Sequence, residues 1–178
     1  MEYIELEGQE EEKRKFQNES TGIYAKDFFF EAGRILLQLA KRHQTPFMIA
    51  VVEVDNFEEL KRKNGDRIAY QILTLTAKII GEKFRTSDIV ADMEDGQIGV
   101  IFYNTSNVNA KTALEGLRKK IEGSQYILNE EKINVTASIG AVVMHNLISA
   151  RTVETLYEQA KISVETAQKK GKNCVVVG

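Results

Sequence analysis

The chain has 178 residues, of which 43% are hydrophobic and 28% charged, a balance typical of one soluble globular domain. Its formal net charge of -2 and its single cysteine, Cys174, argue against a strongly basic nucleic-acid-binding protein and exclude an internal disulfide. No apolar run reaches the roughly 18 residues that a membrane span requires, and no signal peptide opens the sequence, so we expect a cytoplasmic protein.

The chain begins with a charged segment, which precedes the first apolar elements of the domain. Residues 1–18 are rich in charged side chains and predict a solvated helix or linker, which could pair with a copy of itself in a homodimer. We expect one domain over residues 19–178. Its first helix is predicted over 28–43 and stops before Pro46, the only proline. The run FMIAVVEV, residues 47–54, is continuously apolar and rich in β-branched residues, which predicts a buried central strand.

The rest of the chain alternates helices and strands. In chain order we predict two helices, a β-hairpin, a helix, a strand, a helix and a short final strand, over residues 55–66, 67–84, 88–103, 108–121, 133–145, 152–169 and 173–177. This order is the split βαβ, or ferredoxin-like, pattern. We therefore predict an α+β fold with a mainly antiparallel central sheet flanked by helices.

This topology places acidic residues together. The end of the 47–54 strand should lie beside the hairpin turn, so Glu53, Asp55, Glu94 and Asp95 converge on one edge of the sheet. In a palm-type polymerase or cyclase, carboxylates at such an edge hold Mg²⁺ ions that bind a triphosphate. A ferredoxin-like fold also carries many unrelated functions, so topology and acidic residues alone do not decide the activity.

Five sequence blocks narrow the choice among the proteins that share this fold. STGIYAKDFF, VVEVDNF, RTSDIVADM, VTASIGAVV and AKISVETAQKKGKNCV follow one another in the order and at the intervals found in GGDEF domains. From about Asn18 to Val177 the chain thus resembles the GGDEF domain, the fold of diguanylate cyclases. The resemblance implies a palm-like domain of bacterial second-messenger signalling.

The motif that gives this family its name is altered here. The resemblance places its turn on Glu94, Asp95, Gly96 and Gln97, followed by Ile98. The family's two glycines, which let the substrate approach the backbone, fall on Glu94 and Asp95. Its two carboxylates fall on Gly96, which has no side chain, and on the neutral Gln97. The turn therefore carries negative charge where a triphosphate should lie and lacks acidic groups where metal should bind.

Other substrate positions that the resemblance assigns are also changed. The metal-binding aspartate of the first strand falls on Glu53, the two guanine-contacting residues on Lys61 and Tyr70, and a phosphate-contacting lysine on Gln168, with Lys172 nearby. Tyr70 could fill the empty nucleotide pocket. Together these departures imply a domain without diguanylate cyclase activity and without a bound cofactor.

One alternative interpretation assigns an enzymatic activity to the chain. A one-residue slip in the hairpin would bring Asp95 to the metal position, and Glu53 with Asp95 could then bind Mg²⁺ and a purine nucleotide, GTP or ATP, for residual cyclase or phosphohydrolase activity. Such a slip turns every following side chain to the other face of the sheet, or requires a bulge.

A second family site is retained in part. Arg85 and Asp88 match the R-x-x-D motif, where the resemblance implies that cyclic di-GMP binds away from the active site. Arginine is a bidentate donor to phosphate or guanine, and aspartate can accept from guanine N–H groups. A further arginine of the family falls on Gly116, with Arg118 close by. Alternatively, Arg85 and Asp88 only pair locally at a helix end.

The sequence thus favours a non-catalytic GGDEF-like signalling domain. It would act as a cyclic di-GMP receptor or as a dimerising, partner-binding module of a larger protein. A purely structural domain without a small ligand is the remaining possibility.

Overall fold

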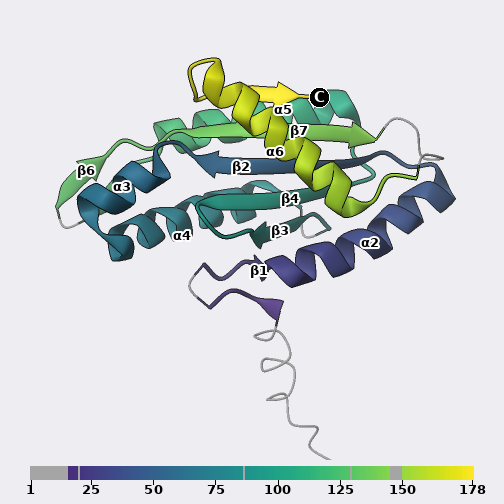
Figure 1. Cartoon of the computed structure of the whole chain (residues 1–178), viewed down its shortest axis with the longest axis horizontal. Helices are drawn as coiled ribbons and strands as arrows, with labels where there is room; N and C mark the ends of the chain where they lie inside the picture. Colours follow the sequence, from purple (N-terminus) through teal and green to yellow (C-terminus); the bar gives the residue numbers. More distant parts are fainter. Residues whose placement is uncertain (1–15, 20, 86, 129, 145–149) are drawn as a thin grey trace, which may run out of the picture.

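A computed structural model of the chain describes residues 16–178 except 20, 86, 129 and 145–149 (Figure 1). The charged helix or linker predicted for residues 1–18 therefore lies almost wholly outside the described residues. None of the described helices combines the length and apolar character needed to cross a membrane.

A six-stranded sheet forms the centre of the domain, in the order β1-β3-β4-β2-β7-β8. Its strands are β1 (Tyr24–Ala25), β2 (Phe47–Val54), β3 (Ile89–Asp92), β4 (Gln97–Tyr103), β7 (Ala137–Met144) and β8 (Val175–Val177). The four central strands pair antiparallel, whereas β1 and β8 add parallel pairs at the two edges. The predicted interior position of residues 47–54, beside both the hairpin and the later strand, is confirmed.

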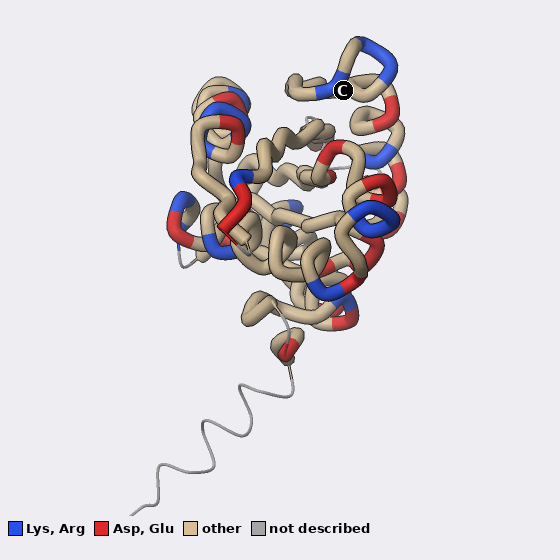
Figure 2. Tube along the Cα trace, turned by 90° about the vertical axis from the view of Figure 1, so that its left-hand side faces the viewer, with Lys and Arg blue, Asp and Glu red and all other residues tan. Residues whose placement is uncertain are grey.

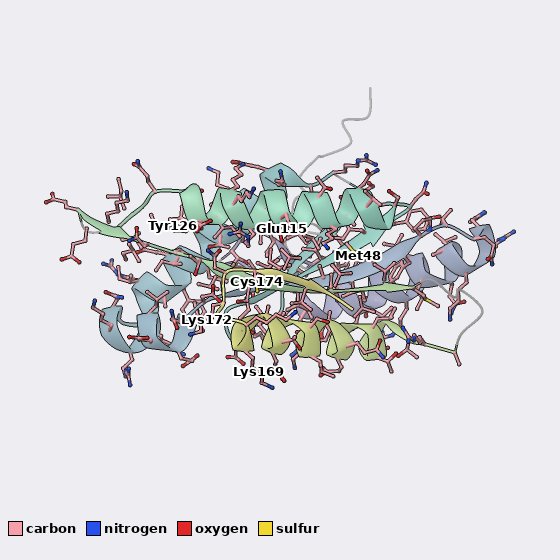
Figure 3. The ribbon with its side chains drawn as sticks, turned by 90° about the horizontal axis from the view of Figure 1, so that it is seen from above. Met48, Glu115, Tyr126, Lys169, Lys172 and Cys174 are labelled. Carbon is pink, nitrogen blue, oxygen red and sulfur yellow. The ribbon has the colours of Figure 1, made fainter. Side chains whose placement is uncertain are left out.

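Helices cover both faces of this sheet (Figure 1). They are α2 (Lys26–His43), α3 (Phe57–Asn64), α4 (Asp66–Lys83), α5 (Asn107–Gly123) and α6 (Val153–Lys169). Figure 3 shows α5 and α6 on opposite sides of the strands. Side chains of α2 and α6 pack into one buried cluster, and those of α4 and α5 pack into the other.

The strand β2 is apolar throughout because both of its faces are buried. Met48, Ala50 and Val52 contribute to the cluster under α4 and α5, while the alternate side chains of Phe47 and Ile49 contribute to the cluster under α2 and α6. Charged residues lie mainly along the outer helices and turns, and the central strands carry few of them (Figure 2).

The structure differs from the sequence prediction between residues 126 and 136. The predicted strand 133–145 is divided: β7 begins at Ala137, and a separate hairpin pairs β5 (Tyr126–Leu128) with β6 (Glu131–Ile133). Thr136, which precedes β7, still pairs with Asp55, at the next position of the β2–β7 register. Its carbonyl accepts from the Asp55 backbone N–H at 2.9 Å, and its hydroxyl donates to the Asp55 carboxylate at 2.7 Å.

Candidate functional site

At the edge of the sheet where metal would bind, the carboxylate of Glu53 is held between two amides. Glu53 lies near the end of β2, directly opposite Gln97 at the start of β4. Gln97 Nε2 donates to Glu53 Oε2 at 2.8 Å, and Gln168 Nε2, from the last turn of α6, donates to Glu53 Oε1 at 2.6 Å. Each oxygen of this carboxylate thus accepts a hydrogen bond from a neutral side-chain amide. We call Glu53, Gln97 and Gln168 the amide cage.

A tyrosine fixes the orientation of the cage. The Tyr157 hydroxyl, from α6, donates to Gln97 Oε1 at 3.1 Å, which leaves Gln97 Nε2 to donate to Glu53. Burial, and to a smaller extent the charges of Glu158 and Glu53, raises the pKa of Tyr157 to about 12, so the phenol stays protonated near neutral pH.

The sequence did not single out Tyr157 as more than a core residue. One signal was available: Tyr157 and Gln168 are eleven residues apart (168 − 157) on one helix, about three turns, and therefore share a face.

The hairpin turn excludes a carboxylate at the family's metal position. Glu94, Asp95 and Gly96 all have positive φ, at 71°, 49° and 78°. A Cβ at Gly96 would lie 2.6 Å from the ring of Phe57, so a side chain at this position would clash as well as strain the backbone. Glu94 pairs with Lys26 at 3.0 Å on the surface.

The strand register rules out the proposed one-residue slip. Gln97 pairs with Glu53 and Ile98 pairs with Val52, in continuous ladders without a bulge. Ile98, Val100 and Phe102 point into the core, as the unshifted alignment requires. Asp95 remains exposed at the tip of the turn.

The donor set at this edge does not fit a magnesium ion. No group of three or more His, Cys, Asp or Glu side chains gathers within the part of the chain that the structure describes. The neighbouring carboxylate, Asp55, accepts hydrogen bonds from Thr136, from Ser138 at 2.6 Å and from the Asn173 backbone N–H at 3.0 Å. Mg²⁺ requires near-octahedral oxygen ligands, whereas Glu53 faces amide N–H groups.

The family's base-binding positions are occupied by contacts within the protein. The Tyr70 ring lies edge-on to Phe57, with centroids 6.3 Å apart, and Lys61 Nζ lies 6.0 Å from the Tyr70 centroid. Lys172, in the turn after α6 (Figure 3), donates to the side chain of Asn56 at the start of α3. Tyr70 and Lys61 thus contact residues of the protein itself, while both side chains keep part of their surface exposed.

The R-x-x-D residues form a turn between α4 and β3. Asp88 Oδ2 accepts from the Arg85 backbone N–H at 3.1 Å, and the Arg85 carbonyl accepts from the Asp88 N–H at 3.0 Å. Asp88 Oδ1 is buried and has no hydrogen-bond partner among the described residues. Burial raises the pKa of Asp88, an effect that its bond from Arg85 N–H and the Arg85 charge partly oppose. The Arg85 side chain is exposed.

Arg118 is held by contacts within the protein. Its side chain is only 13% exposed, pairs with Glu115 at 3.1 Å and Glu122 at 2.9 Å, and donates to Asn173 Oδ1 at 2.9 Å. It therefore joins α5, where Glu115 is labelled in Figure 3, to the turn before β8. Nε and Nη1 of Arg118 are thus engaged within the protein, and the expectation that Arg118 binds ligand stays a prediction.

Comparison with known proteins decides the family. The model of the family described as "Diguanylate cyclase, GGDEF domain" matches residues 16–174. The chain belongs to this GGDEF family.

Individual relatives are more distant. The chain is 28% identical over 129 residues to diguanylate cyclase A of Treponema denticola, covering 72% of this chain and 34% of that protein. It is 25% identical over 154 residues to diguanylate cyclase DgcS of Shewanella oneidensis, covering 86% and 50%. The chain thus spans a third to a half of the length of these relatives.

A solved structure confirms the fold. The coiled coil and GGDEF domain of DgcB from Caulobacter crescentus, solved in complex with cyclic di-GMP, matches with a TM-score of 0.88 at 16% identity, covering 97% of this chain and 90% of that one. At this identity the likeness shows the fold alone.

Proposed function

We propose that this GGDEF domain makes no cyclic di-GMP and instead serves as a non-catalytic signalling domain that binds cyclic di-GMP at Arg85 and Asp88. The observation that carries the first part is the amide cage. Both oxygens of Glu53, the carboxylate at the family's first-strand metal position, accept from the amides of Gln97 and Gln168.

The chemistry of cyclisation explains why the cage matters. Joining two GTP molecules requires metal ions that activate a 3′-hydroxyl and take up charge on the leaving pyrophosphate. A metal at Glu53 would share a carboxylate that already accepts two hydrogen bonds, each worth about 1.5–3 kcal/mol as a bond to a charged acceptor. It would then meet amide N–H groups instead of oxygen ligands. No carboxylate can replace them from position 96, where Phe57 leaves no room for a side chain.

The R-x-x-D turn supports the second part of the proposal. Arg85 is exposed and can reach a phosphate, and Asp88 keeps an unpartnered acceptor that a guanine N–H could satisfy. Because Asp88 Oδ1 is buried, a guanine reaches it only if the turn shifts on binding. Binding at this site therefore includes a local rearrangement between α4 and β3.

We propose that the domain works in the cytoplasm as a module next to other domains or a protein partner. The charged residues 1–18 are the segment through which it would dimerise.

Calorimetric titration tests this function. We expect cyclic di-GMP to bind without Mg²⁺, and we expect no binding of GTP or ATP. Because a charged hydrogen bond is worth about 1.5–3 kcal/mol, Arg85→Ala and Asp88→Ala should each weaken binding roughly tenfold or more. Glu94→Ala and Asp95→Ala, in the altered turn, are the matched controls and should leave affinity unchanged. Mg²⁺-dependent binding of GTP or ATP that requires Glu53 would contradict the proposal and favour the nucleotide-binding alternative.

A further inference from the structure

The end of α4 reaches across to a gap in α5. Gly116 has no side chain, and a Cβ built there would lie 3.0 Å from Lys83 Nζ and 3.4 Å from Lys83 Cε. The ammonium group of Lys83 therefore occupies the space in which a side chain at position 116 would begin. The adjacent pair Glu82 and Lys120 bridges the same two helices, with 3.6 Å between Oε2 and Nζ.

Lys83 keeps its charge free for a ligand. No acidic side chain within the described part of the chain forms an ion pair with it, whereas Arg118, the nearby cation of α5, is held by Glu115 and Glu122. Lys83 is exposed and lies two residues before Arg85. The R-x-x-D turn is thus preceded by a second available cation, carried by α4 and directed over α5.

We propose that Lys83 is the second phosphate-binding cation of the cyclic di-GMP site in this chain, in the place that the family gives to a helix arginine. This inference rests on the proposed function. An ammonium group is a compact point charge that binds a phosphate oxygen, but it lacks the planar fork with which arginine binds a guanine edge. Lys83 therefore sets affinity through the phosphates and contributes no base selectivity.

Asp88 then determines the base selectivity of the site. A carboxylate accepts from the paired N–H groups of a guanine edge, whereas adenine presents a ring acceptor beside its amino group. Substitutions of Lys83 and Asp88 should consequently have different effects when the affinities for cyclic di-GMP and cyclic di-AMP are compared.

The experiment is a titration of both dinucleotides at low and high salt. Lys83→Ala should weaken cyclic di-GMP binding roughly tenfold, as expected for loss of one charged contact, and should reduce its salt dependence. It should reduce cyclic di-AMP affinity by the same factor, so that the ratio between the ligands stays constant. Asp88→Ala should lower that ratio. Lys78→Ala, an exposed lysine of the same helix, is the matched control and should change neither.

A double-mutant cycle adds an independent check. An arginine at position 116 must displace the Lys83 ammonium group, so Gly116→Arg should change affinity little in the native chain and restore it in the Lys83→Ala background. If Arg85→Ala abolishes binding while Lys83→Ala leaves affinity and salt dependence unchanged, this inference is wrong and the proposed function stands. If the unmodified chain binds no cyclic di-GMP, both are wrong.

Discussion

Replacing Gln97 by glutamate tests the amide cage most sharply. The variant loses the 2.8 Å hydrogen bond from Gln97 Nε2 to Glu53, worth about 1.5–3 kcal/mol as a bond to a charged acceptor. It also sets two carboxylates face to face, which at about 4 Å and an effective dielectric constant near 20 adds as much as about 4 kcal/mol before they move apart. We expect a net destabilisation of about 2–4 kcal/mol at pH 7 after this relaxation.

The assay is thermal and denaturant unfolding as a function of pH. A loss of this size lowers the melting temperature by roughly 4–16 °C for a domain of this length. The paired carboxyls hold a proton more tightly in the folded than in the unfolded chain, so their folded pKa is raised and the native state binds more protons. The variant's loss of stability relative to the native chain is therefore greatest above the raised pKa and becomes smaller as the pH falls.

An exposed glutamine supplies the control. Gln71→Glu, on the outer face of α4, makes the same chemical change away from the cage and should alter stability by less than about 0.5 kcal/mol. If Gln97→Glu is as stable as this control at pH 7 and shows no pH-dependent recovery, Gln97 does not contact Glu53 and the reasoning fails.

Three further predictions address packing, titration and the role of Arg118. Gly140→Ala would place its Cβ 2.2 Å from the Ala160 carbonyl oxygen, so it should lower the free energy of unfolding by about 3 kcal/mol or more. Gly81→Ala is the control: its Cβ would meet nothing within 4 Å on an exposed part of α4, so it should stabilise the domain by about 0.5–1 kcal/mol. The free energy of unfolding of Asp88→Asn should differ from that of the native chain by no more than about 1 kcal/mol at pH 7. Because burial raises the pKa of Asp88 in the folded state, protonation of Asp88 favours folding. The native chain should therefore become more stable than the variant as the pH falls. Arg118→Ala should destabilise by about 1–2 kcal/mol without changing ligand affinity, because its bonds join α5 to the turn before β8; a variant with native stability and weakened cyclic di-GMP binding would reverse that assignment.

Periodicity was sufficient for the elements with continuous patterns. The apolar run of β2 and the helical stripes of α2, α4, α5 and α6 are each buried against the sheet, so local sequence and tertiary burial agree. It failed between residues 126 and 136, where β7 begins only at Ala137 and a separate hairpin pairs β5 with β6. The hydroxyl of Thr136 binds Asp55, a partner 81 residues away that no pattern within residues 133–145 reveals.

The site was predictable as a set of lost functions, but its new contacts were not. The resemblance identified Glu53, Gln97 and Gln168 as altered positions, because each falls on a family motif. That the three side chains bind one another depends on the distance between β2, β4 and α6, which sequence does not supply. The same holds for Lys83, whose relation to Gly116 arises only from the packing of α4 against α5.

The most direct test of the central claim is a cyclase assay on the purified chain. GTP is supplied with Mg²⁺ or Mn²⁺, and cyclic di-GMP is measured by chromatography beside a diguanylate cyclase that retains both turn carboxylates. We predict no product at micromolar protein, because the metal edge holds an amide cage in place of metal ligands. Formation of cyclic di-GMP that disappears in Glu53→Ala would contradict the account.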